Sequence, residues 1–193
     1  MRNNPASRRL LLSLLCLALL AACAATPQIL PVQPRLDIAA ESERGRGRTM
    51  AIEVVDARGT DLIGLRDPRD HQSAITAAPE MLRNIQQTLE QGFRRQGFTL
   101  IELGDQADIA LEVRLTRLGY QRSSAGLLKD LETAAEFRVT SVMASKTMDG
   151  VYSAARTKDT LVTPSLAANA DVLNEHVSTA LSKLVADDRL TSE

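Results

Sequence analysis

The residues with the clearest chemical potential are Leu-Ala-Ala-Cys at positions 20–23, where a thiol directly follows an apolar run. The run extends from Leu10 to Leu20, and three arginines with no acid come before it: Arg2, Arg8 and Arg9. A basic start, a short apolar core and small residues are the parts of a secretory signal, so we expect residues 1–22 to be cut off between Ala22 and Cys23. The apolar stretch is shorter than the ~20 residues that a membrane-spanning helix needs.

The same four residues resemble the bacterial lipobox, which has a leucine, two small residues and then a cysteine. The resemblance implies that the Cys23 thiol takes a diacylglycerol and that the new amino group is open to acylation. Two or more acyl chains anchor a protein stably, whereas one holds it only marginally. Ala24 stands where an aspartate favours the inner membrane in enteric bacteria, so the outer membrane is favoured over the inner. The alternative is an ordinary cleaved signal with a cysteine at the cut.

The composition excludes several classes of function. The formal net charge is -1, and removal of the three signal arginines leaves about -4, which argues against general binding of nucleic acid. Cys16 leaves with the signal and Cys23 takes the lipid, so the mature chain has neither a disulfide nor a free thiol. Aromatic residues make up only 3% with no Trp, which argues against sugar-stacking platforms.

Other groups capable of catalysis are sparse. A metal site needs His, Cys or carboxylates in close spacing, and only His71 and His176 are present, with no His-x-x-x-His pair. No Gly-x-Ser-x-Gly occurs, and the carboxylate pair Asp105 and Asp108 falls at a turn. We therefore expect no catalytic residue, no metal and no cofactor. The alternative is a cell-envelope hydrolase or metal enzyme with an unrecognised site.

The chain divides into three parts. After the signal, residues 23–48 comprise the lipidated cysteine and a stretch with three spaced prolines and a glycine-interrupted charged run, which favours a flexible tether of up to roughly 75 Å. Residues 49–190 form a single periplasmic domain of ordinary size.

Within the domain, apolar periodicity predicts helices over 79–96 and 168–188, each with one apolar face. Alternation predicts strands, the clearest over 108–120, where Leu111 faces inward and Glu112 outward. Strands are also expected at 49–55, 98–102, 131–147 and 151–162, with a hairpin turn at Asp149-Gly150. The expected fold is a two-layer α+β domain, with a mainly antiparallel sheet of about five strands and both helices on one face.

If both helices cover one sheet face, the other face stays open. Alternation along three consecutive strands assigns four cations to it, mixed with Glu112 and Glu136: Arg114, Arg138, Arg156 and Lys158. A solvated surface whose opposite charges pair across strands is the simpler interpretation. The functional alternative is a face for an anionic partner, either a lipid headgroup or an acidic envelope protein.

The chain also resembles the YajG family of bacterial lipoproteins, from Cys23 almost to its end. The resemblance rests on Ile52–Asp56 followed by Arg58, on the helix from Leu82 closed by Gln96-Gly97-Phe98, and on the terminal helix from Asp171 to Leu184. It implies an outer-membrane lipoprotein whose molecular function is not established. It carries over no catalytic residue.

Overall fold

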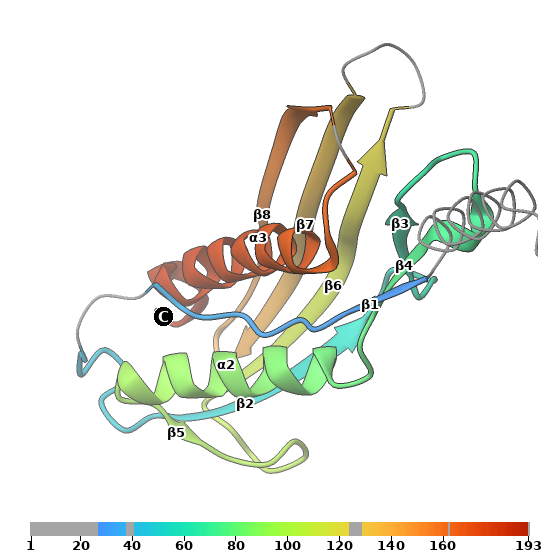
Figure 1. Cartoon of the computed structure of the whole chain (residues 1–193). Helices are drawn as coiled ribbons and strands as arrows, with labels where there is room; N and C mark the ends of the chain where they lie inside the picture. Colours follow the sequence, from blue (N-terminus) through green and yellow to red (C-terminus); the bar gives the residue numbers. More distant parts are fainter. Residues whose placement is uncertain (1–26, 38–40, 124–128, 162, 193) are drawn as a thin grey trace, which may run out of the picture.

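A computed structural model describes residues 27–37, 41–123, 129–161 and 163–192. In these ranges eight strands form one mixed sheet, and two long helices pack on it (Figure 1). The helices are α2 (Met81–Arg95) and α3 (Leu166–Ala186), and short 3-10 turns cover His71–Ser73 and Asp188–Leu190. The strands are β1 (Gln28–Leu30), β2 (Thr49–Asp56), β3 (Leu62–Leu65), β4 (Ala74–Ala77), β5 (Thr99–Leu100), β6 (Ile109–Arg122), β7 (Lys129–Met143) and β8 (Lys146–Thr160).

The long strand β6 is the axis of the sheet. Along one side it pairs with β7 in antiparallel fashion, and β7 pairs with β8 in the same way. Its other side is shared: β2 runs parallel to its first half, and β3 meets it near its end, where Gly64 pairs with Tyr120. The sheet continues outward from β2 to β5 and from β3 through β4 to β1.

The α+β class is confirmed, but the sheet has eight strands rather than five and is mixed rather than mainly antiparallel. The reason is the route of the chain between β2 and β6. That route includes α2, and a crossover that includes a helix returns the chain parallel to the strand it left. Antiparallel pairing is found in the hairpins after β6 and between β3 and β4.

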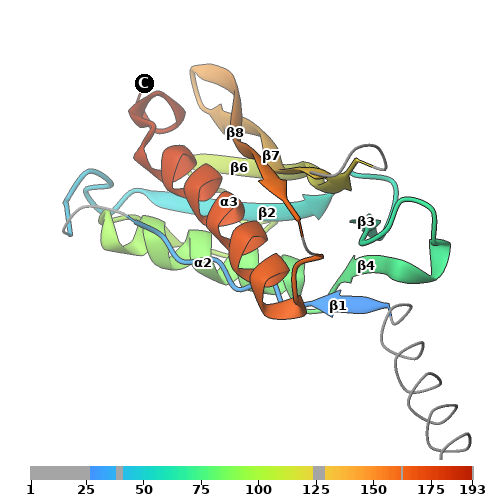
Figure 2. The same ribbon diagram turned by 45° about the horizontal axis from the view of Figure 1, so that its top comes forward.

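Both helices lie on the same side of the sheet (Figure 2). The side chain of Gln86 in α2 donates to the carbonyl oxygen of Ile52, and His176 in α3 contacts Thr133 of β7. The core between the layers contains the inward residues of β6 and the apolar faces of the helices, including Leu111, Val113, Ile85, Leu89, Phe93, Leu173 and Leu181. The predicted inward face of residues 109–115 is confirmed.

The predicted flexible tether is wrong for the described parts of residues 27–48. Gln28–Leu30 form β1, which pairs in parallel with β4. Leu30 is 0% exposed and Val32 is buried beside it in the core. The alternation of buried and exposed residues continues to Asp37, as expected for an extended segment with one face on a core. The folded domain therefore includes Gln28 and the residues after it and does not begin at Thr49.

Residues 31–37 run between the two helices and are fastened to both (Figure 1). The backbone N–H groups of alternate residues Gln33, Arg35 and Asp37 donate to Asn174, Ser178 and Ser182 of α3, at 2.6, 2.9 and 2.9 Å. Two residues of extended chain and four residues of helix advance by similar lengths, about 6–7 Å, so the two series stay in register. On the opposite side, Asn84 and Thr88 of α2 donate to the carbonyl oxygens of Val32 and Pro34.

Residues 41–48 pack against the end of α2. The N–H of Ser42 donates to the carbonyl oxygen of Arg95, and that of Gly45 to the carbonyl oxygen of Gln96. Gly45 lies so close to Gly97 that a Cβ atom on it would come within 2.5 Å of the Gly97 backbone. A glycine is therefore required there by close backbone approach rather than by flexibility.

The β7–β8 hairpin turns at residues 144–145, because Met143 pairs with Lys146. The predicted turn at Asp149-Gly150 is wrong, and both residues lie within β8. The Asp149 carboxylate accepts a hydrogen bond from the Thr140 hydroxyl across the strands, and a Cβ atom on Gly150 would collide with the ring of Tyr152. Packing of this tyrosine over the strand therefore accounts for the glycine.

Candidate functional site

The predicted lipidation and cleavage residues, Cys23 and Ala22, lie outside the described residues. The chain is described from Pro27 onward, so four residues separate Cys23 from Gln28, the first residue of β1. Within the described ranges, neither helix is both long and apolar enough to cross a membrane.

The four cations of the predicted binding face do not share one face. Arg114 pairs directly with Arg138, and both point to the open side of the sheet. Arg156 instead lies opposite the buried Thr133, and Lys158 opposite the buried Leu131, so both belong to the side that carries the helices. The predicted face is wrong for these two residues, because the tight turn at 144–145 sets even-numbered β8 residues against the inward residues of β7.

Opposite charges pair with each other on the open face. Arg114 lies 3.0 Å from Glu112, and Arg138 lies 3.8 Å from Glu136. Arg117 and Glu132 form a third pair between β6 and β7. Exposed pairs of this kind contribute only about 0–1 kcal/mol each, but they leave little free positive charge for a partner. The geometry favours the solvated interpretation of this face.

A β-bulge at Thr116 changes which residues of β6 face the helices. Leu115 pairs with Phe137 but Arg117 pairs with Glu136, so Thr116 is an extra residue in the strand. Odd-numbered residues point inward before the bulge and even-numbered residues after it. Arg122 therefore points to the helix side, a placement that simple alternation from Ile109 misses. In the sequence, the only sign of this bulge is a break in the alternation of polar and apolar residues after Thr116. Such a break is a weak sign, because strands with polar residues on both faces often show one.

His176 is buried within the domain. Its Nε2 lies 2.8 Å from the hydroxyl oxygen of Thr133. Burial lowers the pKa of His176 below its usual value, and the charge of Arg156 lowers it further while that of Glu175 raises it. The buried imidazole has a neutral hydroxyl as its hydrogen-bond partner, which fits a structural role at the edge of the core.

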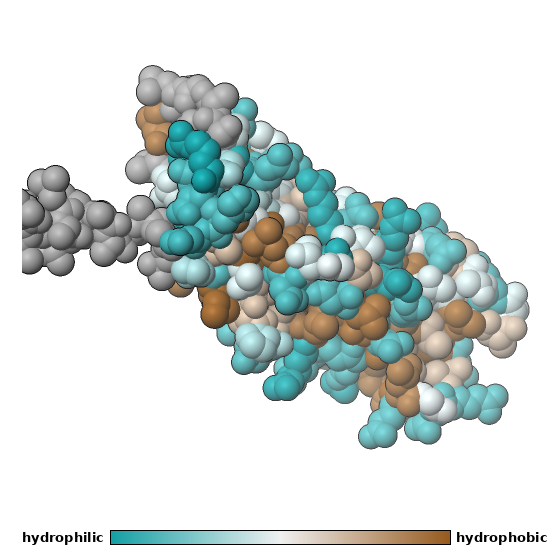
Figure 3. Space-filling model, turned by 90° about the vertical axis from the view of Figure 1, so that its right-hand side faces the viewer, coloured by the Kyte–Doolittle hydropathy of each residue, from teal (hydrophilic) through white to brown (hydrophobic). Residues whose placement is uncertain are grey.

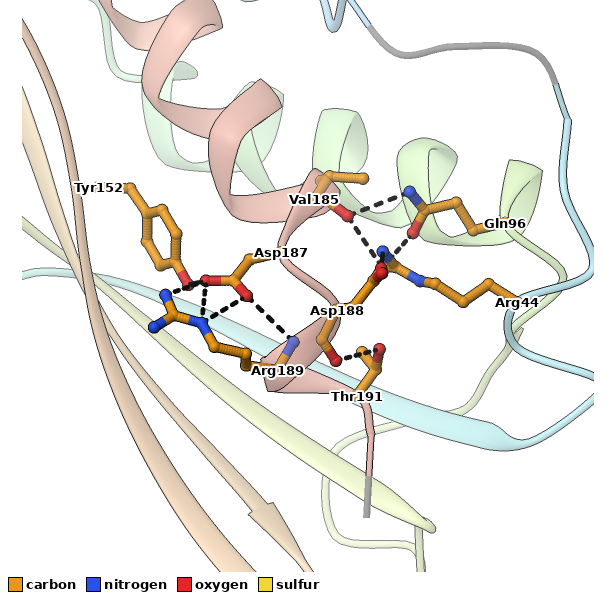
Figure 4. Close-up of polar contacts among 8 residues, drawn as sticks. All are labelled: Arg44, Gln96, Tyr152, Val185, Asp187, Asp188, Arg189 and Thr191. Carbon is orange, nitrogen blue, oxygen red and sulfur yellow. Dashed lines mark hydrogen bonds and ion pairs between the residues drawn. The ribbon is translucent and has the colours of Figure 1, made fainter.

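The chain end after α3 forms a polar clasp (Figure 4). The Asp187 carboxylate accepts hydrogen bonds from the Tyr152 hydroxyl at 2.7 Å and from the guanidinium of Arg189, which lowers the pKa of Asp187. Arg44 donates to Asp188, to the Gln96 side chain and to the Val185 carbonyl oxygen. Arg44 thus joins the C-terminal ends of both helices, where a cation is favourable. Both carboxylates of the clasp are held by guanidinium groups, and of the Arg44 nitrogens only Nε is buried without a partner among the described residues, so the clasp is best explained as a structural fastening.

A pocket beside the start of α2 contains the nearest approach to acid–base chemistry. Asp56, Arg58 and Asp61 line it together with Pro79 and Leu82. The Arg58 guanidinium holds the Asp56 carboxylate with two hydrogen bonds, at 2.8 and 2.6 Å, and lowers the pKa of Asp56. A general acid needs a raised pKa, so this pocket does not favour a hydrolase. Among the described residues no group of three His, Cys, Asp or Glu side chains converges to hold a metal.

Comparison with known families decides the classification. A family model described as an uncharacterised lipoprotein matches residues 34–192. The chain belongs to this lipoprotein family. The match confirms the YajG-like resemblance, and it begins well inside the segment that the sequence assigned to a tether. The description of the lipoprotein family names no activity. No curated protein matches the chain by sequence.

Solved structures share the fold of this lipoprotein at low identity. Protein XCC0632 from Xanthomonas campestris is 12% identical, with a TM-score of 0.50 over 83% of this chain and 91% of that chain. An uncharacterised protein is 9% identical, with a TM-score of 0.53 over 82% of this chain and 97% of that chain. These similarities show a shared fold and do not extend to function.

Proposed function

We propose that this protein is an envelope lipoprotein, anchored through acyl chains on Cys23 to the periplasmic face of the outer membrane. Its domain binds or supports a partner there and catalyses no reaction. The family match, the Leu-Ala-Ala-Cys sequence and Ala24 support the anchor and its location. The neutral partner of His176 and the Arg58-bound Asp56 support the absence of catalysis.

One observation carries the proposal furthest, namely that the chain is already packed into the domain at Gln28. Five residue steps lead from Cys23 to Gln28, and they span at most about 18 Å. The sequence alone had allowed a tether of roughly 75 Å for residues 24–48. An anchor on Cys23 therefore holds the domain against the bilayer surface. The partner must then be a component of the membrane or a protein whose contact surface lies close to it.

The proposal is tested by lengthening this link. An insertion of twenty Gly and Ser residues between Ala25 and Thr26 leaves the lipobox and β1 unchanged but lowers the local concentration of the domain at the surface. We expect the parent chain to sediment with outer membranes and to form discrete cross-linked products in intact cells. The insertion should retain the membrane fraction and weaken those products.

The same insertion placed at Gly59, an exposed loop, is the control for the added length. Cross-linked products that persist unchanged with the longer link would contradict a surface-held domain. Sedimentation of the parent chain with the inner membrane would contradict the location.

A further inference from the structure

Near the end of β6, three polar atoms are buried without a hydrogen-bond partner among the residues that the structure describes. They are the hydroxyl oxygen of Tyr120 and the Nε atoms of Arg66 and Arg122. Tyr120 is only 3% exposed, and its phenol points from the sheet to the helix side. Buried polar groups nearly always have partners in folded proteins, so three unpartnered donors in one neighbourhood point to a missing acceptor.

The topology of the sheet brings these residues together from two distant segments. Gly64 of β3 pairs in parallel with Tyr120 of β6. Two residues further along the chain from each lie Arg66, just after the end of β3, and Arg122, the last residue of β6. The Arg122 guanidinium donates to the Arg66 carbonyl oxygen at 3.4 Å and to the Thr163 hydroxyl at 2.6 Å. The bulge at Thr116 gives Tyr120 and Arg122 the same side of the sheet. The fold therefore assembles two guanidinium groups and a phenol.

The charge of this group is unbalanced. Neither Arg66 nor Arg122 has an ion pair in the part of the chain that the structure describes. Arg122 of β6 pairs with Leu131 of β7, which in turn pairs with Lys158 of β8. Lys158 therefore adds a third cation to the same row of residues across the sheet. Asp67 is the neighbouring acid. Arg69 binds both of its carboxylate oxygens and is the main cause of its lowered pKa, to which the charge of Arg122 adds.

The charges of the two arginines act on the phenol of Tyr120. Burial raises the pKa of Tyr120, and the charges of Arg122 and Arg66 oppose that rise. The hydroxyl therefore stays protonated at neutral pH and is available as a donor. The three atoms without a partner can thus all donate hydrogen bonds, and two of them belong to planar, positively charged guanidinium groups. This arrangement suits the oxygen atoms of a phosphate group.

We propose that Arg66, Arg122 and Tyr120 form an anion site that takes the phosphate group of an acidic phospholipid headgroup. The chain's entry into the domain locates the site near the bilayer. Gln28, Ile75, Gly64 and Tyr120 lie in one row across β1, β4, β3 and β6. Three strand spacings separate Gln28 from Tyr120, about 14 Å.

The position of this row explains the choice of a lipid over a free anion. Cys23 is at most about 18 Å from Gln28, so the proposed anchor and the anion site belong to the same end of the molecule. This part of the inference rests on the proposed anchoring at Cys23. Figure 3 views the domain from the side of β3 and β4. Strongly hydrophilic residues gather at the upper left of the coloured surface, and exposed hydrophobic residues lie below them. A headgroup site beside the anchor would fix the orientation of the domain as well as its distance from the membrane.

The test uses the full-length lipoprotein in a non-ionic detergent and measures binding by calorimetry. The probes are dihexanoyl phosphatidylglycerol, dihexanoyl phosphatidylcholine and inorganic phosphate, each as monomers in solution. We expect the phosphatidylglycerol to bind about tenfold more tightly than either other probe. The double variant Arg66→Gln/Arg122→Gln should weaken its binding by about tenfold or more, because charge-assisted hydrogen bonds are lost.

Two further variants keep the test sharp. Arg114→Gln/Arg138→Gln removes the same charge from the open face and should leave binding unchanged. Tyr120→Phe keeps the shape of the buried ring and should weaken binding several-fold even if the double arginine variant fails to fold. Equal affinity for both lipids, or unchanged affinity in the Tyr120 and arginine variants, would overturn the proposal. Inorganic phosphate binding as tightly as phosphatidylglycerol would overturn its lipid part.

This experiment is independent of the anchor. Binding is measured in detergent, so a Cys23→Ser chain should bind phosphatidylglycerol as the parent does. Loss of palmitate labelling is a separate readout of the anchor. Retained labelling in that variant would refute the anchor at Cys23 while the headgroup site remained supported.

Discussion

Asn169 donates a hydrogen bond from its side-chain amide to the side-chain oxygen of Gln28, at 3.0 Å, and both side chains are buried. Gln28 opens the first strand and Asn169 lies in the first turns of the last helix, 141 residues later. A buried amide that loses its partner costs about 1–3 kcal/mol, so the contact holds the two ends of the domain together. It fixes the point at which the chain enters the fold, close to the proposed anchor.

Residues 28–37, the entry segment of the domain, should contribute strongly to its stability. Leu30→Ala is expected to lower the free energy of unfolding by about 2–5 kcal/mol, because this leucine is fully buried against the core. Ile29→Ala is the matched control: its side chain is 61% exposed on the opposite face and should change stability by less than about 0.5 kcal/mol. Denaturant unfolding of both variants gives the comparison. Equal, small effects would restore the flexible-tether interpretation.

The sequence predicted the parts of the fold whose partners are local. The apolar stripe of α2 and the alternation of residues 109–115 each depend on a short window, and both faces are confirmed. The prediction for the entry segment was wrong because its prolines and charges indicate a linker, whereas its hydrogen-bond partners are more than 140 residues away, at Asn174, Ser178 and Ser182. Those three residues recur every four positions beside the apolar stripe of α3, and this is the signal that could have revealed the docked segment.

The prediction of the binding face was wrong for a different reason. Alternation assigns a side of the sheet only if the register is known, and one misplaced turn or one bulge reverses it. The turn at residues 144–145 moved Arg156 and Lys158 to the helix side, and the bulge at Thr116 moved Arg122 there as well. Neither device has a strong sequence signature.

The two core faces are tested by one substitution in each layer. Leu111→Ala in β6 and Leu181→Ala in α3 should each destabilise the domain by about 2–5 kcal/mol, since both side chains are buried. Leu103→Ala, at an exposed position, serves as the control for loss of an apolar side chain. Chemical denaturation measures all three, and a change below about 0.5 kcal/mol at either buried position would mean that its face is wrongly assigned.

Arg44 should matter more than its neighbours in the charged run. Arg44→Ala removes three hydrogen bonds to groups at the ends of α2 and α3, and we expect a loss of about 1–3 kcal/mol. Arg46→Ala is the control, because its exposed side chain has no hydrogen bond or ion pair to the described residues. Thermal unfolding of the two variants distinguishes a clasp from a solvated linker. Similar melting temperatures for both would argue against the clasp.

His176 predicts a pH dependence of stability. Burial holds the pKa of His176 below its usual 6.5, so the folded state binds this proton less readily than the unfolded state. Its contribution is therefore present above about pH 6.5 and is lost as the pH falls through the folded pKa. His176→Gln should remove this part of the stability profile between pH 7 and 5. His71→Gln, in the exposed turn before β4, should leave it in place. A His71-dependent profile would contradict the assignment.

Lipidation of Cys23 decides where the domain lies, because the short distance from that residue to Gln28 would hold the domain at the bilayer. The direct measurement is metabolic labelling with palmitate, comparing the parent chain with Cys23→Ser at matched expression. We expect the parent chain to carry the label and to float with membranes, and the variant to carry none. A Cys23→Ser chain that still takes up palmitate and floats with membranes would contradict the account at its centre.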